Sequence, residues 1–170
     1  MFRLADRLGD VANTLDDVVS GALRVLDSFG LEFCTMRRVA AELDVQPSAL
    51  YHHVKDKQTL LALMAARIVA EVKIGDDLVE FAHRLREAML AVRDGADVVA
   101  TASAFRLGVS DLEAELAGRS SPDVARTLWI YVVGHTQATQ LHRQASELGA
   151  IAKDPDLDAS FERGLAIILS

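Results

Sequence analysis

The chain has little that would cross-link it or hold it in a membrane. Its 170 residues contain one cysteine, Cys34, which excludes an intramolecular disulfide and favours a reducing cytoplasm. We expect Cys34 to be a small buried side chain rather than a reactive thiol. No segment approaches the roughly 20 consecutive apolar residues of a membrane span. The N-terminal MFRLADRLGD carries acids and lacks an apolar run, so we expect neither a secretory signal nor a membrane partner.

The motifs of common enzyme and metal sites are also missing. The sequence has no Gly-x-Ser-x-Gly, no glycine-rich phosphate loop, no CxxC and no HExxH motif. Paired Glu-x-x-His motifs, which helical metal-carboxylate proteins place on their bundle helices, do not occur either. We therefore predict no enzymatic activity, no cofactor and no bound metal.

Negative charge is concentrated in the second part of the chain. The formal net charge of −7 argues against a protein that coats nucleic acid non-specifically. Residues 1–75 hold nine Lys or Arg and ten Asp or Glu, whereas residues 76–170 hold nine and fifteen. The first part is therefore freer than the second to approach an anionic partner.

Apolar residues recur at helical spacing along the chain, and no convincing strand pattern occurs. Thr14, Thr35 and Asp56 stand where their side chains can cap helices, and Gly30 can end the first helix. The pattern predicts an all-α protein, with helices over about 15–29, 36–43, 47–54, 57–73, 77–93 and 97–105, a short helix after 110, and two further helices over about 122–148 and 157–169.

A polar break divides this helical pattern. Gly75 is followed by Asp76 and Asp77, which interrupt the apolar spacing. We therefore expect two domains, residues 1–73 and 74–170, with the fourth helix running from Lys57 to about Lys73 at the end of the first.

Two short helices stand back to back in TMRRVAAELDVQPSALYHHVKDK, residues 35–57. A short helix, a tight turn and a second short helix, with a third helix packed across them, describe a helix-turn-helix DNA reader. The second short helix would enter the major groove, and Arg37 of the first would reach a phosphate or a guanine edge. Spacing alone leaves open a generic helical hairpin with a solvated face. His52 and His53 do not suit one metal ion, because adjacent helical side chains diverge by about 100°.

The stretch from Val18 to about Val72 resembles the DNA-binding domain of the TetR (tetracycline-repressor-like) family, most specifically in TMRRVAAEL, ALYHHVKDK and the LL that follows. Members of this family are dimeric, all-α transcriptional regulators, usually repressors, which a small molecule releases from operator DNA. One departure is Asp44, where the family usually has glycine; aspartate tolerates a left-handed conformation, so we expect the turn to survive. The resemblance implies DNA contacts at Thr35, Met36, Arg37, Pro47, Ser48, Ala49, Tyr51, His52, His53 and Lys57.

A weaker likeness continues into the second part. AMLAVRDGADVVA, LWIYVVGHTQATQLHRQ and FERGLAIIL are similar to the linking segment, the long bundle helix and the final dimerisation helix of the tetracycline-responsive branch. The effector contacts of that branch do not carry over. Its metal-binding histidine aligns with Val99, which cannot bind Mg²⁺, and its antibiotic-contacting histidine and pocket asparagine fall near Lys73 and Phe81. We therefore expect a small, largely apolar effector rather than a metal–tetracycline complex.

Candidate ligand contacts follow from helical position in the second part. A drug-sized site is mostly apolar with a few placed polar groups. The sequence offers both kinds at Phe81, His83, Met89, Ser103, Phe105, Trp129, His135 and Gln137, with Thr136 and Gln140 as further polar candidates. The large apolar members could equally be plain core. His135 is the best single candidate, although it could line either the pocket or the dimer face, and it lies two turns from His142, too far for both to hold one ion easily.

Two helices of the second part carry more apolar surface than one small domain covers. The long helix has an almost continuous apolar run, LWIYVV, and the last helix has an apolar stripe. We predict a homodimer through these last two long helices, in which Gly134, Ala138 and Gly164 allow close approach. The alternative is that both faces are internal core.

The leading interpretation is a ligand-responsive repressor that binds double-stranded operator DNA as a homodimer. In it the fourth helix would link the two domains mechanically. The alternative is a helical small-molecule-binding protein that does not bind DNA sequence-specifically.

Overall fold

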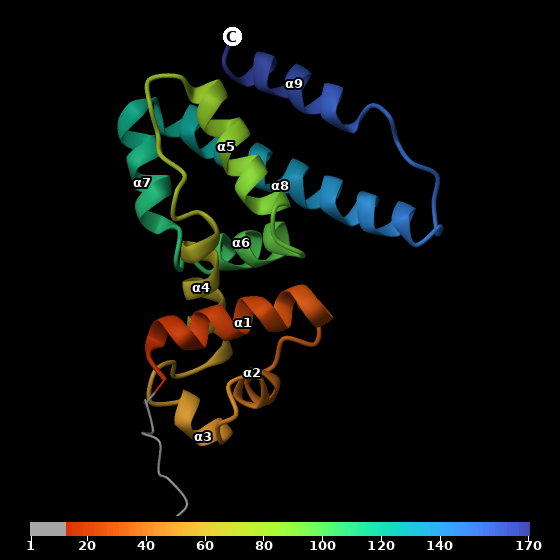
Figure 1. The fold of residues 1–170 in the computed structure, drawn as a ribbon. Helices are drawn as coiled ribbons and strands as arrows, with labels where there is room; N and C mark the ends of the chain where they lie inside the picture. The colour runs from red at the N-terminus through yellow and green to blue at the C-terminus, as the bar shows by residue number, and fades with distance from the viewer. Residues whose placement is uncertain (1–12) are drawn as a thin grey trace, which may run out of the picture.

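The computed structural model describes residues 13–170, which are helical apart from turns and connecting segments (Figure 1). The helices are α1 (Leu15–Phe29), α2 (Met36–Glu42), α3 (Pro47–Leu50), α4 (Lys57–Ile68), α5 (Leu78–Leu90), α6 (Gly95–Ala104), α7 (Ser110–Arg119), α8 (Pro122–Glu147) and α9 (Leu157–Ile168). The prediction of an all-α protein is confirmed over this range. The expectation about a secretory signal concerns residues 1–12 and lies outside the described residues. Within 13–170, no helix combines the length and the apolar character needed to cross a membrane.

Polar side chains begin the helices where the sequence predicts them. Thr14, Thr35 and Asp56 each accept a hydrogen bond from a backbone N–H in the first turn of the helix that follows, which satisfies a donor that has no partner inside the helix. The Asp56 carboxylate accepts from both the N–H and the hydroxyl of Thr59 at 2.7 Å. These hydrogen bonds lower the pKa of Asp56. Gly30 ends α1 with a φ of 81°, a conformation that favours glycine.

Helices α1–α4 form the lower group in Figure 1. α1 packs against α2 and α4, and α2 packs against α3. Cys34 is buried in this group, where its thiol donates to the Ala22 carbonyl oxygen and its pKa is raised by desolvation. The expectation of a buried thiol is therefore confirmed. Side chains at most 1% exposed fill the shared core: Val18, Leu26, Val39, Leu50 and Met64.

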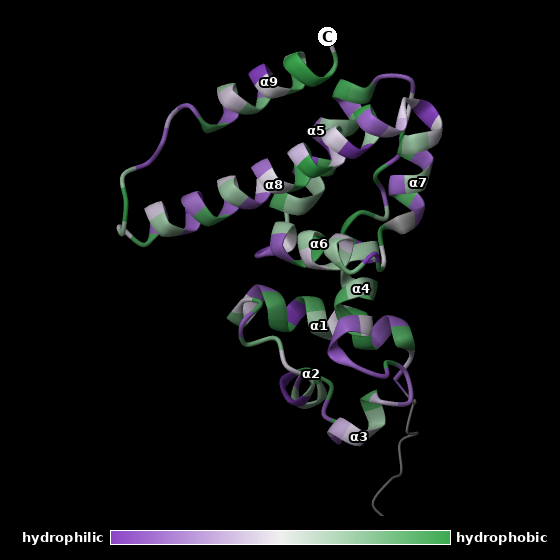
Figure 2. Cartoon of the chain, turned by 180° about the vertical axis from the view of Figure 1, so that it is seen from behind, coloured by the Kyte–Doolittle hydropathy of each residue, from purple (hydrophilic) through white to green (hydrophobic). Residues whose placement is uncertain are grey.

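Helices α5–α9 form the upper group, and α8 packs against α5, α6, α7 and α9 (Figure 1). α6 also packs extensively against α4 of the lower group. The loop after α6 closes on α4 at Gly108, where an added Cβ would lie 2.1 Å from the Ala62 carbonyl oxygen. The two groups therefore share one apolar core at the waist, where Figure 2 shows the ribbons of α4 and α6 mostly in green and white.

The fourth helix is shorter than predicted, because it ends at Ile68 rather than near Lys73. Beyond it the chain turns, and the Val72 N–H bonds back to the Val69 carbonyl oxygen at 2.9 Å. Val72 and the nearby Ile74 are then buried, at 7% and 5% exposure. Burying these two side chains draws the segment off the helical path. The prediction of one helix running to the end of the first domain is therefore wrong.

Other helix boundaries differ from the prediction by a few residues. α3 is a single turn, Pro47–Leu50, and turns rather than helix continue through His53. α5 ends at Leu90 and α6 begins at Gly95, rather than at about 93 and 97. Between them Asp94 adopts a left-handed φ of 53°, so the two helices meet at a sharp turn.

Tyr131 of α8 reaches across to α9 and fills the space beside Gly164. Its hydroxyl donates to the Ser160 and Phe161 carbonyl oxygens at 3.1 and 3.0 Å, and its ring stacks on Phe161 with centroids 5.7 Å apart. An added Cβ on Gly164 would lie 1.9 Å from that hydroxyl, whereas one on Gly134 would have no described atom within 4 Å. Gly164 therefore allows a close approach within the chain, and its part in a contact between two chains stays a prediction.

We predict that Gly164→Ala lowers the free energy of unfolding by about 1–3 kcal/mol, because the new methyl group must displace the Tyr131 ring and its hydrogen bonds. Gly118→Ala on α7 is the matched control, because an added Cβ there meets no described atom within 4 Å and the position lies outside the predicted dimer helices α8 and α9. Alanine favours a helix by up to about 1 kcal/mol over glycine, so this variant should be no less stable than the natural chain. Urea unfolding followed by circular dichroism measures both. Equal stability of the two variants would contradict the contact.

Candidate functional site

The short helix α3 lies at the lower edge of the lower group of helices (Figure 1). Polar side chains on α3 and in the turn after it are exposed. Leu50 and Val54, each 1% exposed, anchor it to the core of the lower group. Because a single helical turn is not stable alone, these buried contacts hold it in place. The side chains exposed around it are those of Ser48, Tyr51, His52 and His53.

Helix α2 lies beside α3, and the turn between them has the expected form. Asp44 adopts a left-handed φ of 54° there, so aspartate replaces the family's usual glycine as predicted. At the start of α2, Thr35 is exposed and its hydroxyl accepts the Arg38 N–H at 3.2 Å. Arg37 is exposed and Met36 is half-buried. Arg37, the positively charged side chain of α2 that we predict to contact DNA, is therefore open to solvent.

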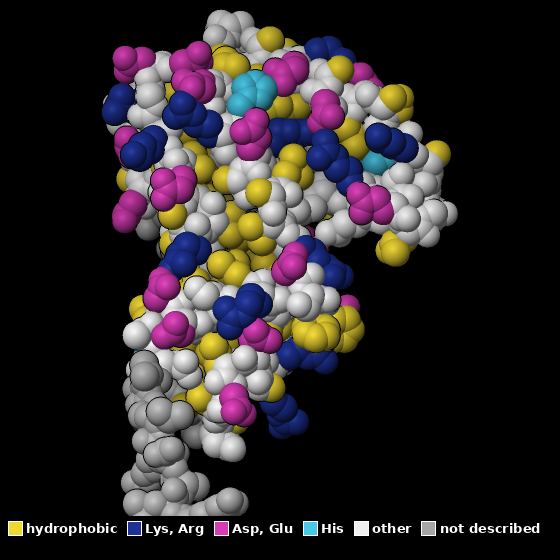
Figure 3. Space-filling model, in the orientation of Figure 1, with side chains coloured by type: hydrophobic (Ala, Val, Ile, Leu, Met, Phe, Trp, Pro, Cys, Tyr) yellow, Lys and Arg dark blue, Asp and Glu magenta, His cyan; other side chains and the backbone are white. Residues whose placement is uncertain are grey.

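The start of α4 completes the set predicted to contact DNA. Lys57 lies in its first turn and is half-buried, as are Pro47 and Ala49 of α3. Lys55 is exposed two residues before Lys57 and adds a positive charge that the sequence analysis did not single out. Figure 3 shows Lys and Arg side chains on the outer surface of this lower group. All predicted contact residues therefore lie on α2 or at its N-cap, on α3 or in the turn after it, or at the start of α4.

The predicted ligand residues, by contrast, do not surround one cavity. Phe81 and Met89 of α5 are at most 1% exposed in the core, whereas Phe105, just after α6, is 61% exposed. His83 is half-buried, pairs with Glu162 of α9 at 3.3 Å and meets the edge of an aromatic ring. A role for these side chains in ligand binding stays a prediction.

Three of the polar and aromatic candidates join helices to one another. Trp129 of α8 donates its indole N–H to the Ser103 hydroxyl of α6 at 2.8 Å, and Ser103 donates to Glu113 of α7 at 2.6 Å. Gln137 of α8 donates to Asp97 of α6 at 2.6 Å. These hydrogen bonds give the Trp129 indole N–H, the Ser103 hydroxyl and the Gln137 amide nitrogen partners within the chain.

His135 lies where α5, α8 and α9 meet. Its Nδ1 accepts from the Arg86 guanidinium at 3.2 Å, and its Nε2 lies 2.9 Å from the Ser160 hydroxyl. Because a guanidinium only donates, the imidazole proton resides on Nε2. Arg86 is 6% exposed, binds Asp158 of α9 at 2.6 Å and lies over the Phe161 ring at 4.4 Å. Arg86 was not among the predicted site residues, because a buried arginine in an amphipathic helix cannot be told from a solvated one by its spacing.

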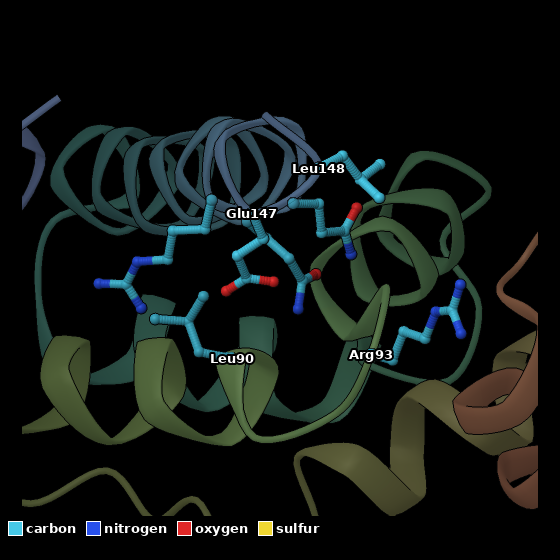
Figure 4. A pocket seen from close by; sticks show the side chains of 7 residues that line it. Leu90, Arg93, Glu147 and Leu148 are labelled. Atoms are coloured by element: carbon cyan, nitrogen blue, oxygen red, sulfur yellow. The ribbon is translucent and has the colours of Figure 1, made fainter. Parts of the chain in front are cut away.

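Two cavities lie along α8. Most of the polar residues that line them are not among the predicted ligand contacts. Gln140, one of the further polar candidates, lines the first cavity. That cavity, of about 580 Å³ between α5 and α8, is lined by Leu90, Arg93, Gln140, Arg143, Gln144, Glu147 and Leu148 (Figure 4). The second, of about 520 Å³, lies under the α8–α9 connection and includes His142, Lys153, Leu157 and Asp158. Within 13–170 no group of His, Cys, Asp and Glu side chains could hold a metal ion.

The architecture defines the class: an all-helical protein with a helix-turn-helix at one end of a helical bundle. The family described as "Bacterial regulatory proteins, tetR family" matches residues 18–64. The chain is 30% identical to the tetracycline repressor protein class A from transposon 1721 of Escherichia coli, over 89% of this chain and 87% of that protein. The chain therefore belongs to the tetR family of bacterial regulatory proteins.

Solved structures of related proteins show the same fold. BioQ from Mycobacterium smegmatis is 33% identical with a TM-score of 0.81, covering 92% of this chain and 95% of that one. BioQ with its double-stranded DNA operator is 30% identical with a TM-score of 0.79, covering 92% and 96%. A single-residue variant of TetR from Acinetobacter baumannii AYE in complex with minocycline is 28% identical with a TM-score of 0.64, covering 89% and 91%.

The surroundings of His135 predict a dependence of stability on pH. Desolvation, and then the positive charge of Arg86, lower its pKa below the ordinary value of 6.5. The unfolded chain therefore takes up this proton first as the pH falls. We expect neutral His135 to make its full contribution to the free energy of unfolding above pH 6.5. This contribution should be lost progressively as the pH falls from 6.5 to the lower pKa of the folded state.

His135→Gln tests this dependence, because glutamine can accept from Arg86 and donate to Ser160 without titrating. Urea unfolding at a series of pH values should give a steeper loss of stability below pH 6.5 for the natural chain than for the variant. Parallel pH profiles would contradict the assignment of His135 as a neutral, half-buried side chain.

Proposed function

We propose that this tetR-family regulator represses transcription by binding double-stranded operator DNA as a homodimer, from which a small, largely apolar effector releases it. The observation that carries the proposal is the position of α3, with Leu50 and Val54 buried behind it and Tyr51 and the two histidines in solvent. We name α1–α4 the reading head and α5–α9 the body, and we keep the domain division at residues 73 and 74 as part of the proposal.

The reading head offers the two kinds of group that DNA recognition needs. Exposed polar and aromatic side chains on α3 and in the turn after it suit the edges of bases in the major groove. The basic side chains Arg37 and Lys57 suit phosphates on either side. The likeness to BioQ, solved with its double-stranded DNA operator, supports this use of the surface. The role is regulatory rather than catalytic, and it places the protein in the cytoplasm with the DNA.

Substitutions on this surface test the DNA contacts. We expect Tyr51→Ala to weaken binding to the DNA upstream of the gene more than binding to random DNA, because its ring would meet base edges. Lys57→Ala should weaken both and lower the slope of log affinity against log salt by about one, because one phosphate contact is lost. Fluorescence anisotropy at several salt concentrations measures both effects.

Lys153→Ala provides the matched control, since Lys153 is exposed in the α8–α9 connection, away from the reading head. It removes the same charge from the chain and should leave operator affinity unchanged. Natural affinity in the Tyr51 and Lys57 variants would count against these contacts, and no preference for upstream over random DNA in the natural chain would refute the proposed function.

Exposed apolar side chains on α8 and α9 support the homodimer. Along α8, Ile130, Gly134, Ala138 and Leu141 are exposed at spacings of four, four and three residues, which places them on one face of the helix. Ile130 is 59% and Leu141 50% exposed, and Ile167 of α9 is 76% exposed. A two-fold axis would bury this face against its own copy and set two α3 helices to read successive major grooves.

Ile130→Glu should therefore dissociate the dimer, because a carboxylate would be buried against an apolar surface without a partner. Ala117→Glu introduces the same side chain on exposed α7 and should leave the dimer intact. Sedimentation velocity over a concentration series measures both. A natural chain that stays monomeric at all concentrations, or a variant as dimeric as the natural chain, would contradict the assigned interface.

The packing between head and body supports release by an effector. α4 of the head packs against α6 of the body, and α6 packs against α5 and α8, so a displacement in the body reaches the head through side chains already in contact. Coupling of about 1–3 kcal/mol would change operator affinity about 5–150-fold. The likeness to a tetracycline repressor and to a minocycline complex supports a small-molecule effector.

A further inference from the structure

The turn between α5 and α6 joins the body to the end of α1 in the reading head through hydrogen bonds. Arg93 in this turn donates from Nη1 to the Asp27 and Ser28 carbonyl oxygens at 3.0 and 3.2 Å, at the C-terminal end of α1. Asp94 accepts the Leu31 N–H at 2.7 Å, just beyond α1. Consecutive residues of the body therefore hold both the last carbonyls of α1 and the chain that leaves it.

The same turn is held from the other side by α8. Gln144 donates to the Asp94 carboxylate at 2.7 Å. Gln140, one helical turn earlier and only 6% exposed, donates to the Val92 carbonyl oxygen at 2.8 Å and accepts the Ala96 N–H at 3.0 Å. Asp94 thus joins a side chain of α8 directly to the backbone of the reading head.

The cavity of about 580 Å³ between α5 and α8 lies directly against this turn, because Arg93, Gln140 and Gln144 are among its lining residues. Its size falls within the range of small-molecule sites. In Figure 4 the side chains of Leu90 and Glu147 point toward one another across the space between α5 and α8, and Arg93 lies at the side nearest the reading head. An occupant would therefore touch the residues that fix the turn.

The lining favours a molecule with an apolar body and one carboxylate. Leu90 and Leu148 supply apolar wall, and Arg93 and Arg143 supply guanidinium groups. Arg143 uses its Nη2 on Asp158 at 3.0 Å, and Arg93 uses its Nη1 on neutral carbonyls, so each retains further N–H donors for a planar carboxylate. Glu147 faces the same space and opposes additional negative charge, which selects a single carboxylate over a dianion.

We propose that this cavity is the effector site of the regulator and that it takes a small monocarboxylate with an apolar body; the assignment as effector site rests on the proposed function. A carboxylate is a stronger hydrogen-bond acceptor for a guanidinium than a neutral carbonyl is. An occupant therefore competes with Asp27 and Ser28 for Arg93 and loosens the grip on α1. The reading head is then less firmly oriented on the body, and operator affinity falls.

Octanoate is the probe for the site, with octanamide as its uncharged counterpart. Isothermal titration should show octanoate binding at least about tenfold more tightly than octanamide, and Arg143→Gln should weaken octanoate binding by a similar factor. Glu147→Gln should tighten it. Arg163→Gln, which removes an exposed arginine of α9 that pairs with Asp156 outside this cavity, should leave it unchanged.

The coupling is tested by measuring operator affinity with and without saturating octanoate. We expect octanoate to lower the affinity of the natural chain about fivefold or more. Asp94→Asn suits the left-handed φ of 53°, but its amide cannot accept from both Leu31 and Gln144. It should bind octanoate as the natural chain does while its operator affinity responds less than twofold.

The outcomes separate the two proposals. Operator binding that octanoate leaves unchanged, octanoate binding that Arg143→Gln does not weaken, or an Asp94→Asn variant that responds like the natural chain would overturn the inference while the proposed function stands. Failure of the chain to bind operator DNA would overturn the proposed function, and the titrations with octanoate, octanamide and the arginine variants would still decide the carboxylate site.

Discussion

The reading surface depends on the burial of Leu50 and Val54, because α3 is a single helical turn, which is too short to be stable alone. The Val54 N–H also bonds to the Leu50 carbonyl oxygen at 2.9 Å, which closes the turn after α3. Full burial of the two side chains contributes roughly 1.5–3 kcal/mol each, which offsets part of the entropy cost of ordering this segment. The exposed side chains beside them are therefore free to contact DNA, because the buried Leu50 and Val54 side chains stabilise the segment.

Helix α6 forms the main packing contact between the two parts of the molecule. It is packed between α4 of the head and α8 of the body, and its first turn is fixed by Gln140 of α8. Because packed interfaces are not continuously deformable, a small displacement of α8 has to be taken up by α6 or by the turn before it. The break that Gly75 marks in the sequence is thus a change in polarity along the chain and not a gap in the core, which runs through the waist.

Features set by neighbouring residues could be predicted from the sequence. The caps at Thr14, Thr35 and Asp56 and the left-handed Asp44 follow from local hydrogen bonds and backbone sterics. Features set by distant residues could not. The end of α4 depends on where Val72 and Ile74 find a core to enter, and the role of Arg86 depends on Asp158, 72 positions away. The predicted ligand residues were chosen by helical position alone, which does not tell a cavity wall from a filled core.

The single cysteine has a practical consequence. Cys34 sits inside the reading head, its thiol directed at the Ala22 carbonyl oxygen and its pKa raised by burial, so it stays protonated and shielded from thiol-specific reagents while the head is closed. Since the sequence has no other cysteine, the rate at which such a reagent labels the chain reports how often this part opens. Mass spectrometry of Cys34 labelling can thus measure local opening of the reading head without introducing a new cysteine.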